Sequence, residues 1–330
     1  MQEINSKRDY SIDWLKAIGT LCLFLAHVNA PFWINEIRGF DVPLMVFLSA
    51  ILAEGSLSRA SSSLSYITKR IKRLIIPTWI FLVFFYLCMA SVHQLPSVET
   101  IVKSFLFQRD GGIAGYTWII WIYIICSLLT PLLIKINQKN LFLFLPIAVG
   151  YEMACFYTNW SENRIMYYTF FTVIPYGLFL LYALNFKKHS DKAHVINLIL
   201  IAIVHIGYAW FLYKKHSAYV PIGEYKYPAR FYYFSYAIPI LTCMYLAFKA
   251  SGFSDRHNRV ITFISKNSLW IYLWHIFVLA ILKYIFKVEN WVFSYFILVL
   301  ASLGITYIQT TFVGYLMKKH NIGFLKYLLG

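Results

Sequence analysis

Charged residues are scarce in this sequence. Only 13% of its 330 residues are Asp, Glu, Lys or Arg, whereas 60% are hydrophobic and the mean hydropathy is +0.61. A soluble domain has about 25% charged and about 45–50% apolar residues. The scarcity of charge therefore excludes an ordinary soluble protein and indicates a membrane protein. An aromatic content of 19% agrees with this, because Tyr and Trp gather at membrane interfaces.

Paired cysteines are also lacking. A disulfide framework or a zinc site needs cysteines that are paired or clustered in the sequence. The five cysteines stand singly inside apolar runs: Cys22, Cys88, Cys126, Cys155 and Cys243. We interpret them as small packed hydrophobic residues and expect no metal site.

Acidic residues are few. The 14 Asp and Glu stand against 30 Lys and Arg, which gives a formal net charge of +16. A nucleic-acid-binding protein gathers such charge on a soluble domain. Here the basic residues lie in short segments between apolar runs, so we expect no nucleic-acid partner and interpret the charge as membrane orientation.

Apolar runs dominate what is present. A membrane-spanning helix needs about 20 mostly apolar residues. The sequence predicts an all-α polytopic membrane protein, folded as a single domain over residues 1–330 with no internal repeat. The first run has no cleavage site after it, so we expect it to be retained. The ten predicted spans are 11–33, 40–55, 75–93, 117–136, 140–158, 164–184, 194–213, 231–250, 268–286 and 291–317.

The basic residues predict the orientation. If the ten spans alternate the loops between two sides, nineteen Lys and Arg lie on the amino-terminal side, Lys7 and Lys139 among them, and nine on the other. The positive-inside rule then places both termini in the cytoplasm. The two longest loops, 94–116 and 214–230, are predicted to be external.

A polar stripe crosses the first predicted span, which reads "DWLKAIGTLCLFLAH" from Asp13 to His27. Eleven residues separate Lys16 from His27, which on a helix is about 16 Å and about three turns, so both share one face with Thr20. Such a stripe faces protein or a water-filled cavity, because lipid penalises it. The alternatives are a snorkelling Lys16 with Asp13 as its partner, and a buried, hydrogen-bonded His27.

The stripe resembles a family signature. A charged residue, ten intervening residues and a histidine in the first helix look like the Arg-x10-His signature of the integral-membrane acyltransferase family 3, with lysine in place of arginine. Four further segments resemble that family in the same order: "VPLMVFLSA" at 42–50 with Ser49, "KRIKRLIIPTW" at 69–79 with Arg70 and Arg73, "TWIIWIYIICSLLTPLL" at 117–133 with Trp118, and "SKNSLWIYLWH" at 265–275 with His275.

The resemblance implies an enzyme. Members of this family acylate sugars of O-antigens, enterobacterial common antigen, exopolysaccharides and related glycans. For this chain it implies a multi-pass O-acyltransferase of the inner (plasma) membrane, transferring groups other than aminoacyl groups. The implied donor is acyl-coenzyme A, with acetyl-CoA and O-acetylation expected. The implied partners are a polysaccharide or its lipid-linked sugar precursor and the membrane lipids.

The candidate site residues follow from this chemistry. A hydroxyl that attacks a thioester must lose its proton, and histidine is suited to accept it, so His27 is the expected general base. Lys16 is expected to position the donor, with Asp13 beside it in the catalytic stripe. Arg70 and Arg73 are expected to bind the donor phosphates, because Arg suits phosphate, although the same basic stretch could serve orientation alone. Ser49, Trp118 and His275 are expected to line the site.

Two other functions fit parts of the sequence. A transporter or flippase of a lipid-linked saccharide would also need about ten helices and a polar interior, but the inverted repeat and paired broken helices of many transporters are not visible. A receptor or scaffold would leave the ordered motifs unexplained. Glu152 in the fifth predicted span could pair with a basic group or belong to the site, and His205 is interpreted as structural.

Overall fold

Helices make up the fold. The computed structural model describes residues 8–136, 145–157, 163–320 and 322–329, and in these ranges it contains no β-strand. Lys7 and Lys139 lie outside the described residues, as does the start of the span predicted at 140–158. The α-helices are α1 (Tyr10–Leu25), α2 (Phe32–Ile37), α3 (Asp41–Ser58), α4 (Ser63–Ser91), α5 (Val98–Phe105), α6 (Ile119–Leu133), α7 (Leu145–Tyr157), α8 (Arg164–Tyr168), α9 (Phe170–Phe186), α10 (Asp191–His216), α11 (Phe231–Ala250), α12 (Arg259–Lys266), α13 (Ser268–Ala280) and α14 (Trp291–Lys319).

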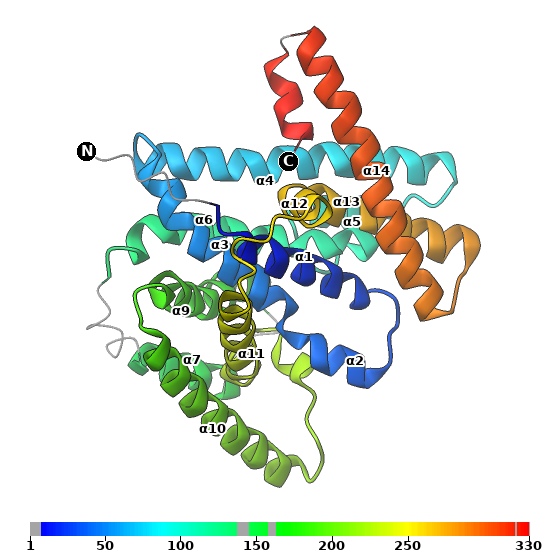
Figure 1. Cartoon of the computed structure of the whole chain (residues 1–330). Coiled ribbons are helices and arrows are strands. Elements are labelled where there is room, and N and C mark those ends of the chain that lie inside the picture. The colour runs from blue at the N-terminus through cyan, green and yellow to red at the C-terminus, as the bar shows by residue number, and fades with distance from the viewer. Residues whose placement is uncertain (1–7, 137–144, 158–162, 321, 330) are drawn as a thin grey trace, which may run out of the picture.

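Short 3₁₀ and π segments connect several of these helices. The 3₁₀ segments are η1 (Arg38–Phe40), η2 (Gly112–Trp118), η4 (Ile222–Tyr225) and η6 (Gly323–Leu328), and the π-helical turn η5 (Ile281–Phe286) continues α13. α10 lies at one edge of the molecule beside α11, far from α4 and from the carboxyl-terminal segment that follows α14 (Figure 1).

The all-α polytopic membrane fold is confirmed. Within the described residues, eight helical segments are long and apolar enough to cross a membrane. They match eight of the ten predicted spans. The other two correspond to α1, with 16 residues, and α7, with 13 described residues.

The first predicted span is too long. Residues 11–33 were expected to form one helix, but α1 ends at Leu25 and the chain turns before α2 begins at Phe32. Asn29 has a left-handed φ of 53°, which Asn tolerates better than most residues, and Pro31 follows directly before α2. His27 therefore lies in this turn, two residues beyond the end of α1.

The third predicted span is too short. It was expected at 75–93, with the basic stretch preceding it, but α4 begins at Ser63, where the hydroxyl of Ser62 caps the helix by accepting from the Ser65 amide. The basic stretch therefore lies on α4, so that its side chains have helical spacing. Arg70 and Arg73 share one face because they are three residues apart.

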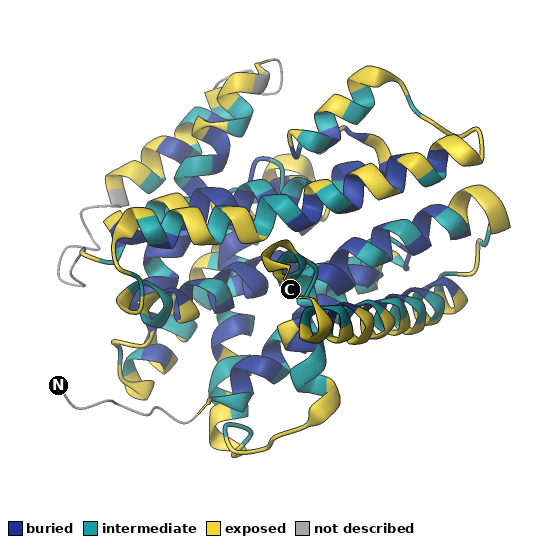
Figure 2. Ribbon diagram, turned by 90° about the horizontal axis from the view of Figure 1, so that it is seen from above, coloured by how far each residue is buried: buried dark blue, intermediate teal, exposed yellow. Residues whose placement is uncertain are grey.

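The helices pack around one large cluster of buried hydrophobic residues that draws on α1, α3, α4, α6, α9, α11, α13 and α14. Phe24, Phe47, Phe81 and Ile120 are among its fully buried members. Exposed residues gather on the outer faces and ends of the helices (Figure 2). On α10 and α14 these exposed faces are largely apolar, which suits contact with lipid rather than water.

The charge distribution gives a topology prediction. Reporter fusions placed after Lys7 and after Lys319 are both expected to report the cytoplasm, because the ten predicted spans put nineteen Lys and Arg on the side that holds the termini. A fusion in the loop between α10 and α11, at Gly223, serves as the external control. A periplasmic or extracellular signal from either terminal fusion would contradict the predicted orientation.

Candidate active site

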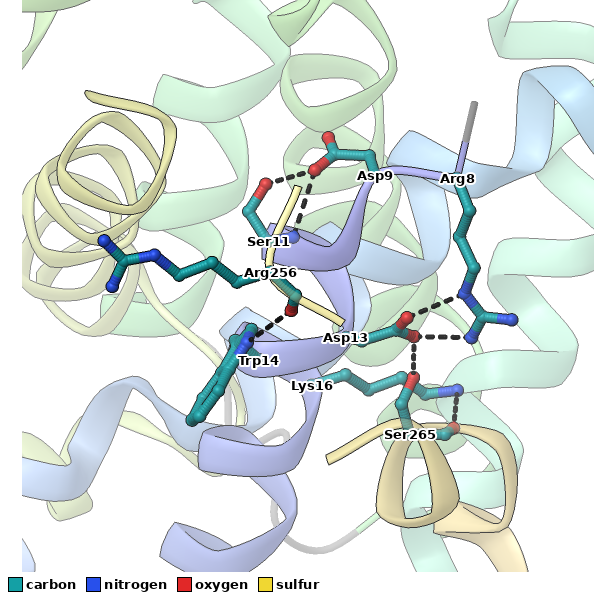
Figure 3. A network of polar contacts seen from close by, with 8 residues as sticks. All are labelled: Arg8, Asp9, Ser11, Asp13, Trp14, Lys16, Arg256 and Ser265. Atoms are coloured by element: carbon teal, nitrogen blue, oxygen red, sulfur yellow. Dashed lines mark hydrogen bonds and ion pairs between the residues drawn. The ribbon is translucent and has the colours of Figure 1, made fainter. Parts of the chain in front are cut away.

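A polar network joins α1 to α12. The guanidinium of Arg8 donates to both carboxylate oxygens of Asp13, at 2.7 and 2.8 Å, and the hydroxyl of Ser265 donates to Asp13 at 2.5 Å. The ammonium of Lys16 donates to the carbonyl oxygen of Ser265 at 2.7 Å. Figure 3 shows Asp13 and Lys16 reaching Ser265 from the same side of α1. Asp13 is thus a partner of Arg8 and Ser265, and its side chain does not line the large cavity described below.

This network predicts a stability effect. Asp13→Ala is expected to destabilise the protein by about 1–3 kcal/mol, because it leaves Ser265 and Arg8 without their buried acceptor. Asp191→Ala removes a carboxylate that pairs with Lys249 on the surface and is the matched control, with little change expected. Thermal unfolding of the purified variants measures both. If the unfolding temperature fell equally in the two variants, the prediction that Asp13 contributes more to stability than Asp191 would be wrong.

A cavity of about 530 Å³ lies between α1, α3, α4, α6 and the α12–α13 segment. Among the described residues, no acidic side chain lines it and six basic side chains do: Arg8, Lys16, Arg59, Arg70, Arg73 and Lys266. They gather at the end of the molecule where α1, α4 and α13 begin and α3 ends, here called the basic mouth. A cluster of cations in a concave site favours a ligand with several negative charges.

Arg70 is the best-placed cation for such a ligand. One terminal nitrogen of its guanidinium donates to the hydroxyl of Ser49 at 2.6 Å, and both residues line the cavity. Its Nε is buried and has no hydrogen-bond partner among the described residues. A buried donor without an acceptor destabilises the protein, so a ligand that accepts a hydrogen bond from Arg70 would remove this free-energy cost and bind more tightly. The structure therefore brings Ser49, Arg70 and Arg73 together in the lining of one cavity.

Lys16 lines the same cavity. An ammonium has three donors, and the carbonyl of Ser265 takes one of them. The remaining donors are available to a ligand. Lys16 and the two α4 arginines thus belong to one basic site although they are more than fifty residues apart in the chain.

His27 lies at the other end of α1, beside a second histidine. Its ring is 5.2 Å from that of His275, centroid to centroid, and 3.9 Å from that of Tyr116. The ring of His275 is fully buried and stacks on Phe24 at 4.6 Å. The Nδ1 of His275 contacts the carbonyl of Tyr272, and its Nε2 has no hydrogen-bond partner within the described ranges. The structure therefore brings His27 and His275 together in one place.

Tyr272 connects the histidine pair to the basic cavity. Its side chain lines the cavity, its ring lies 4.6 Å from that of His275, and its hydroxyl donates to the carbonyl of Tyr116 at 2.6 Å. His27 itself does not line the cavity. Tyr272 and Tyr116 thus connect the cavity that Lys16 lines to the ring of His27.

Trp118 lies apart from the basic cavity. Its indole packs edge-on against Tyr227 at 5.1 Å and borders a small cavity of about 20 Å³ next to Arg109 and Lys226. The ammonium of Lys226 is 3.9 Å from the carboxylate of the buried Asp41. Burial lowers the pKa of Lys226, and Asp41 opposes that shift. These groups lie in or beside the predicted external loops, so Trp118 belongs to the side opposite the basic mouth.

Two polar residues inside the spans have structural partners. Glu152 forms an ion pair with Arg230 at 2.7 Å and also accepts from the hydroxyl of Tyr208. The ring of His205 is 3.0 Å from the hydroxyl of Ser235 and stacks on Tyr232. These contacts agree with the structural interpretation of His205 and give Glu152 its basic partner.

Sequence reasoning missed several lining residues. Arg8, Arg59 and Lys266 were counted only as orientation charges, and nothing in their local sequence marks them as lining a cavity. The chain has 26 tyrosines, and their number gives no reason to select Tyr116 and Tyr272 as site residues. The one usable signal was the spacing of Tyr272 three residues before His275, which places both on one helical face.

The described residues contain no group of three or more His, Cys, Asp and Glu side chains that could hold a metal ion. The helical fold is that of an integral-membrane protein, and a residue of its basic cavity, Tyr272, contacts one of two adjacent histidines. A family model described as an acyltransferase domain, of the acyltransferase family 3, matches residues 9–310. The chain therefore belongs to this family and is a membrane acyltransferase. No curated protein and no solved structure matches it.

Proposed function

We propose that this membrane acyltransferase moves a short acyl group, acetyl being the expected one, from acyl-coenzyme A to a hydroxyl of a cell-surface glycan or its lipid-linked precursor. The observation that carries the proposal is the cavity with six cations at its mouth and Tyr272, the neighbour of His275, in its wall. Coenzyme A carries several phosphates, which suit the basic mouth. The alternatives of a transporter and a scaffold lose support, because the matched family is one of enzymes.

In the proposed reaction His27 acts on the acceptor. Its imidazole takes the proton from the acceptor hydroxyl as the oxygen attacks the thioester carbonyl. The new carbon–oxygen bond forms, the carbon–sulfur bond breaks, and the coenzyme A thiolate leaves with the proton that His27 returns. The products are the glycan ester and free coenzyme A. His275, 5.2 Å from His27, lines the proposed reaction site with it.

The remaining residues bind and position. Arg70, Arg73 and Lys16 are proposed to hold the donor phosphates, and Ser49 holds the guanidinium of Arg70 in place. Asp13 is proposed as a positioning residue, because Arg8 and Ser265 occupy its carboxylate. Trp118 is proposed to lie on the acceptor side, where it contacts Tyr227 and borders a small cavity with Arg109 and Lys226. The protein as a whole is proposed to lie in the inner (plasma) membrane.

Mass spectrometry of surface glycans tests the function. Cells with the gene, cells without it and cells complemented with the His27→Gln variant are compared. We expect one acyl mass increment to disappear without the gene and to stay absent with the variant. An unchanged acylation pattern in cells that lack the gene would contradict the proposed function.

A further inference from the structure

The large cavity changes character along its length. Along α1 the lining residues run from Lys16 through Thr20 to Leu23, and so from charged to apolar. α3 runs in the opposite direction, from Met45 through Leu48 and Ser49 to Arg59. On both helices the cation lies at the basic mouth and the apolar side chain lies at the opposite end, here called the inner end.

The other walls follow the same order. α6 contributes Ile119 and Ile120 near its beginning, and the α12–α13 segment runs from Lys266 at the mouth to Tyr272. The inner end is thus lined by five side chains without a formal charge, each no more than 8% exposed: Leu23, Met45, Ile119, Ile120 and Tyr272.

Two side chains at the inner end, Met45 and Tyr272, are closely packed against neighbouring helices or loops. Met45 packs against Gly19 of α1 so closely that a Cβ at Gly19 would lie 2.9 Å from the Met45 sulfur. The Tyr272 side chain is held by its hydrogen bond to the carbonyl of Tyr116. Met45 and Tyr272 therefore limit the space available to a ligand that enters from the basic mouth.

These features point to an acyl subsite. In acyl-coenzyme A the phosphates and the acyl group are at opposite ends of the extended pantetheine arm. A donor whose phosphates lie at the basic mouth, as proposed above, directs its acyl group to the inner end. The described lining of the inner end offers a carboxylate no Lys or Arg, so that burying one there is strongly unfavourable, whereas a methyl group would be buried among apolar side chains.

We propose that the inner end is an acyl-binding subsite that accepts short, uncharged acyl groups, excludes a dicarboxylic acyl group such as succinyl, and has Met45 and Tyr272 as its length-limiting walls. This inference rests on the proposed function, because it requires coenzyme A phosphates at the basic mouth. The acyl subsite would select among acyl groups, which the basic mouth, as a phosphate-binding site, does not do.

Two donors of equal length test the charge preference. Butyryl-CoA and succinyl-CoA each carry a four-carbon acyl group and differ by one terminal carboxylate. Binding of CoA, butyryl-CoA and succinyl-CoA to purified wild-type protein in lipid nanodiscs is measured by titration calorimetry. We expect succinyl-CoA to bind about tenfold or more weakly than butyryl-CoA, because its carboxylate is buried unpaired. Equal or tighter binding of succinyl-CoA would overturn the acyl subsite.

A pair of variants on α3 tests the length limit. Met45→Ala enlarges the inner end and is expected to raise the affinity for hexanoyl-CoA relative to acetyl-CoA by about tenfold, because the space left by the Met45 side chain admits about two further methylenes at about 0.8 kcal/mol each. Leu52→Ala, seven residues along α3 toward the mouth, removes the same kind of side chain and is expected to leave that ratio unchanged. An unchanged ratio in folded Met45→Ala protein would contradict the length limit.

The outcomes separate this inference from the proposed function. If wild-type protein binds neither CoA nor any acyl-CoA, both fail together. If it binds CoA but does not distinguish succinyl-CoA from butyryl-CoA, only the acyl subsite fails. The wild-type comparison needs no variant and therefore decides the charge preference even if Met45→Ala does not fold.

Discussion

Replacing His27 with glutamine is expected to reduce acyl transfer by about 10²–10⁴-fold, the usual contribution of general acid–base catalysis. Glutamine keeps a hydrogen-bonding side chain of similar length but cannot accept the hydroxyl proton. The variant should still insert into the membrane and bind acyl-coenzyme A, because His27 does not line the basic cavity. Acyl transfer measured at matched membrane abundance gives the result.

His205→Gln is the matched control for this prediction. His205 also lies within a predicted span and has a side-chain partner, Ser235, but it lies on α10 and does not line the basic cavity. We expect the control to keep near-normal transfer. Near-normal transfer by His27→Gln as well would remove His27 from the catalytic role.

Replacing both Arg70 and Arg73 with alanine is expected to weaken acyl-coenzyme A binding by about 100-fold or more. Hydrogen bonds to charged groups contribute about 1.5–3 kcal/mol each, and both guanidinium groups line the cavity. The Arg70→Ala change also removes the buried donor that has no partner in the described structure. Calorimetric titration of the purified double variant with acetyl-CoA measures the loss.

The same helix provides the control for this experiment. Lys69 and Lys72 belong to the same basic stretch and are also three residues apart, but neither lines the cavity. Lys69→Ala with Lys72→Ala removes the same charge and is expected to leave acetyl-CoA binding close to that of the wild type. If both double variants lost acetyl-CoA affinity equally, Arg70 and Arg73 would act only through their general positive charge and not as specific phosphate ligands.

The sequence by itself determined the class of the protein. Long apolar runs with few charges place their backbone in lipid, where the backbone must form its hydrogen bonds internally. Such runs therefore form membrane-spanning helices. The ordered motifs around Lys16, Ser49, Arg70 and His275 also predicted the family, which the match over residues 9–310 confirms. These properties are local, because hydropathy, spacing and motifs are carried by neighbouring residues.

Only the tertiary structure decided the shape of the site. α1 ends at Leu25, and His27 in the following turn lies beside His275, which is about 250 residues away in the chain. The basic mouth draws cations from α1, α4 and α12 and from the residues next to α1 and α3. Half of them, Arg8, Arg59 and Lys266, are marked by the sequence only as orientation charges. Tyr272 became part of the site through its contacts with His275 and Tyr116. Such convergence depends on how helices pack against one another, and hydropathy does not encode the direction in which each helix face points.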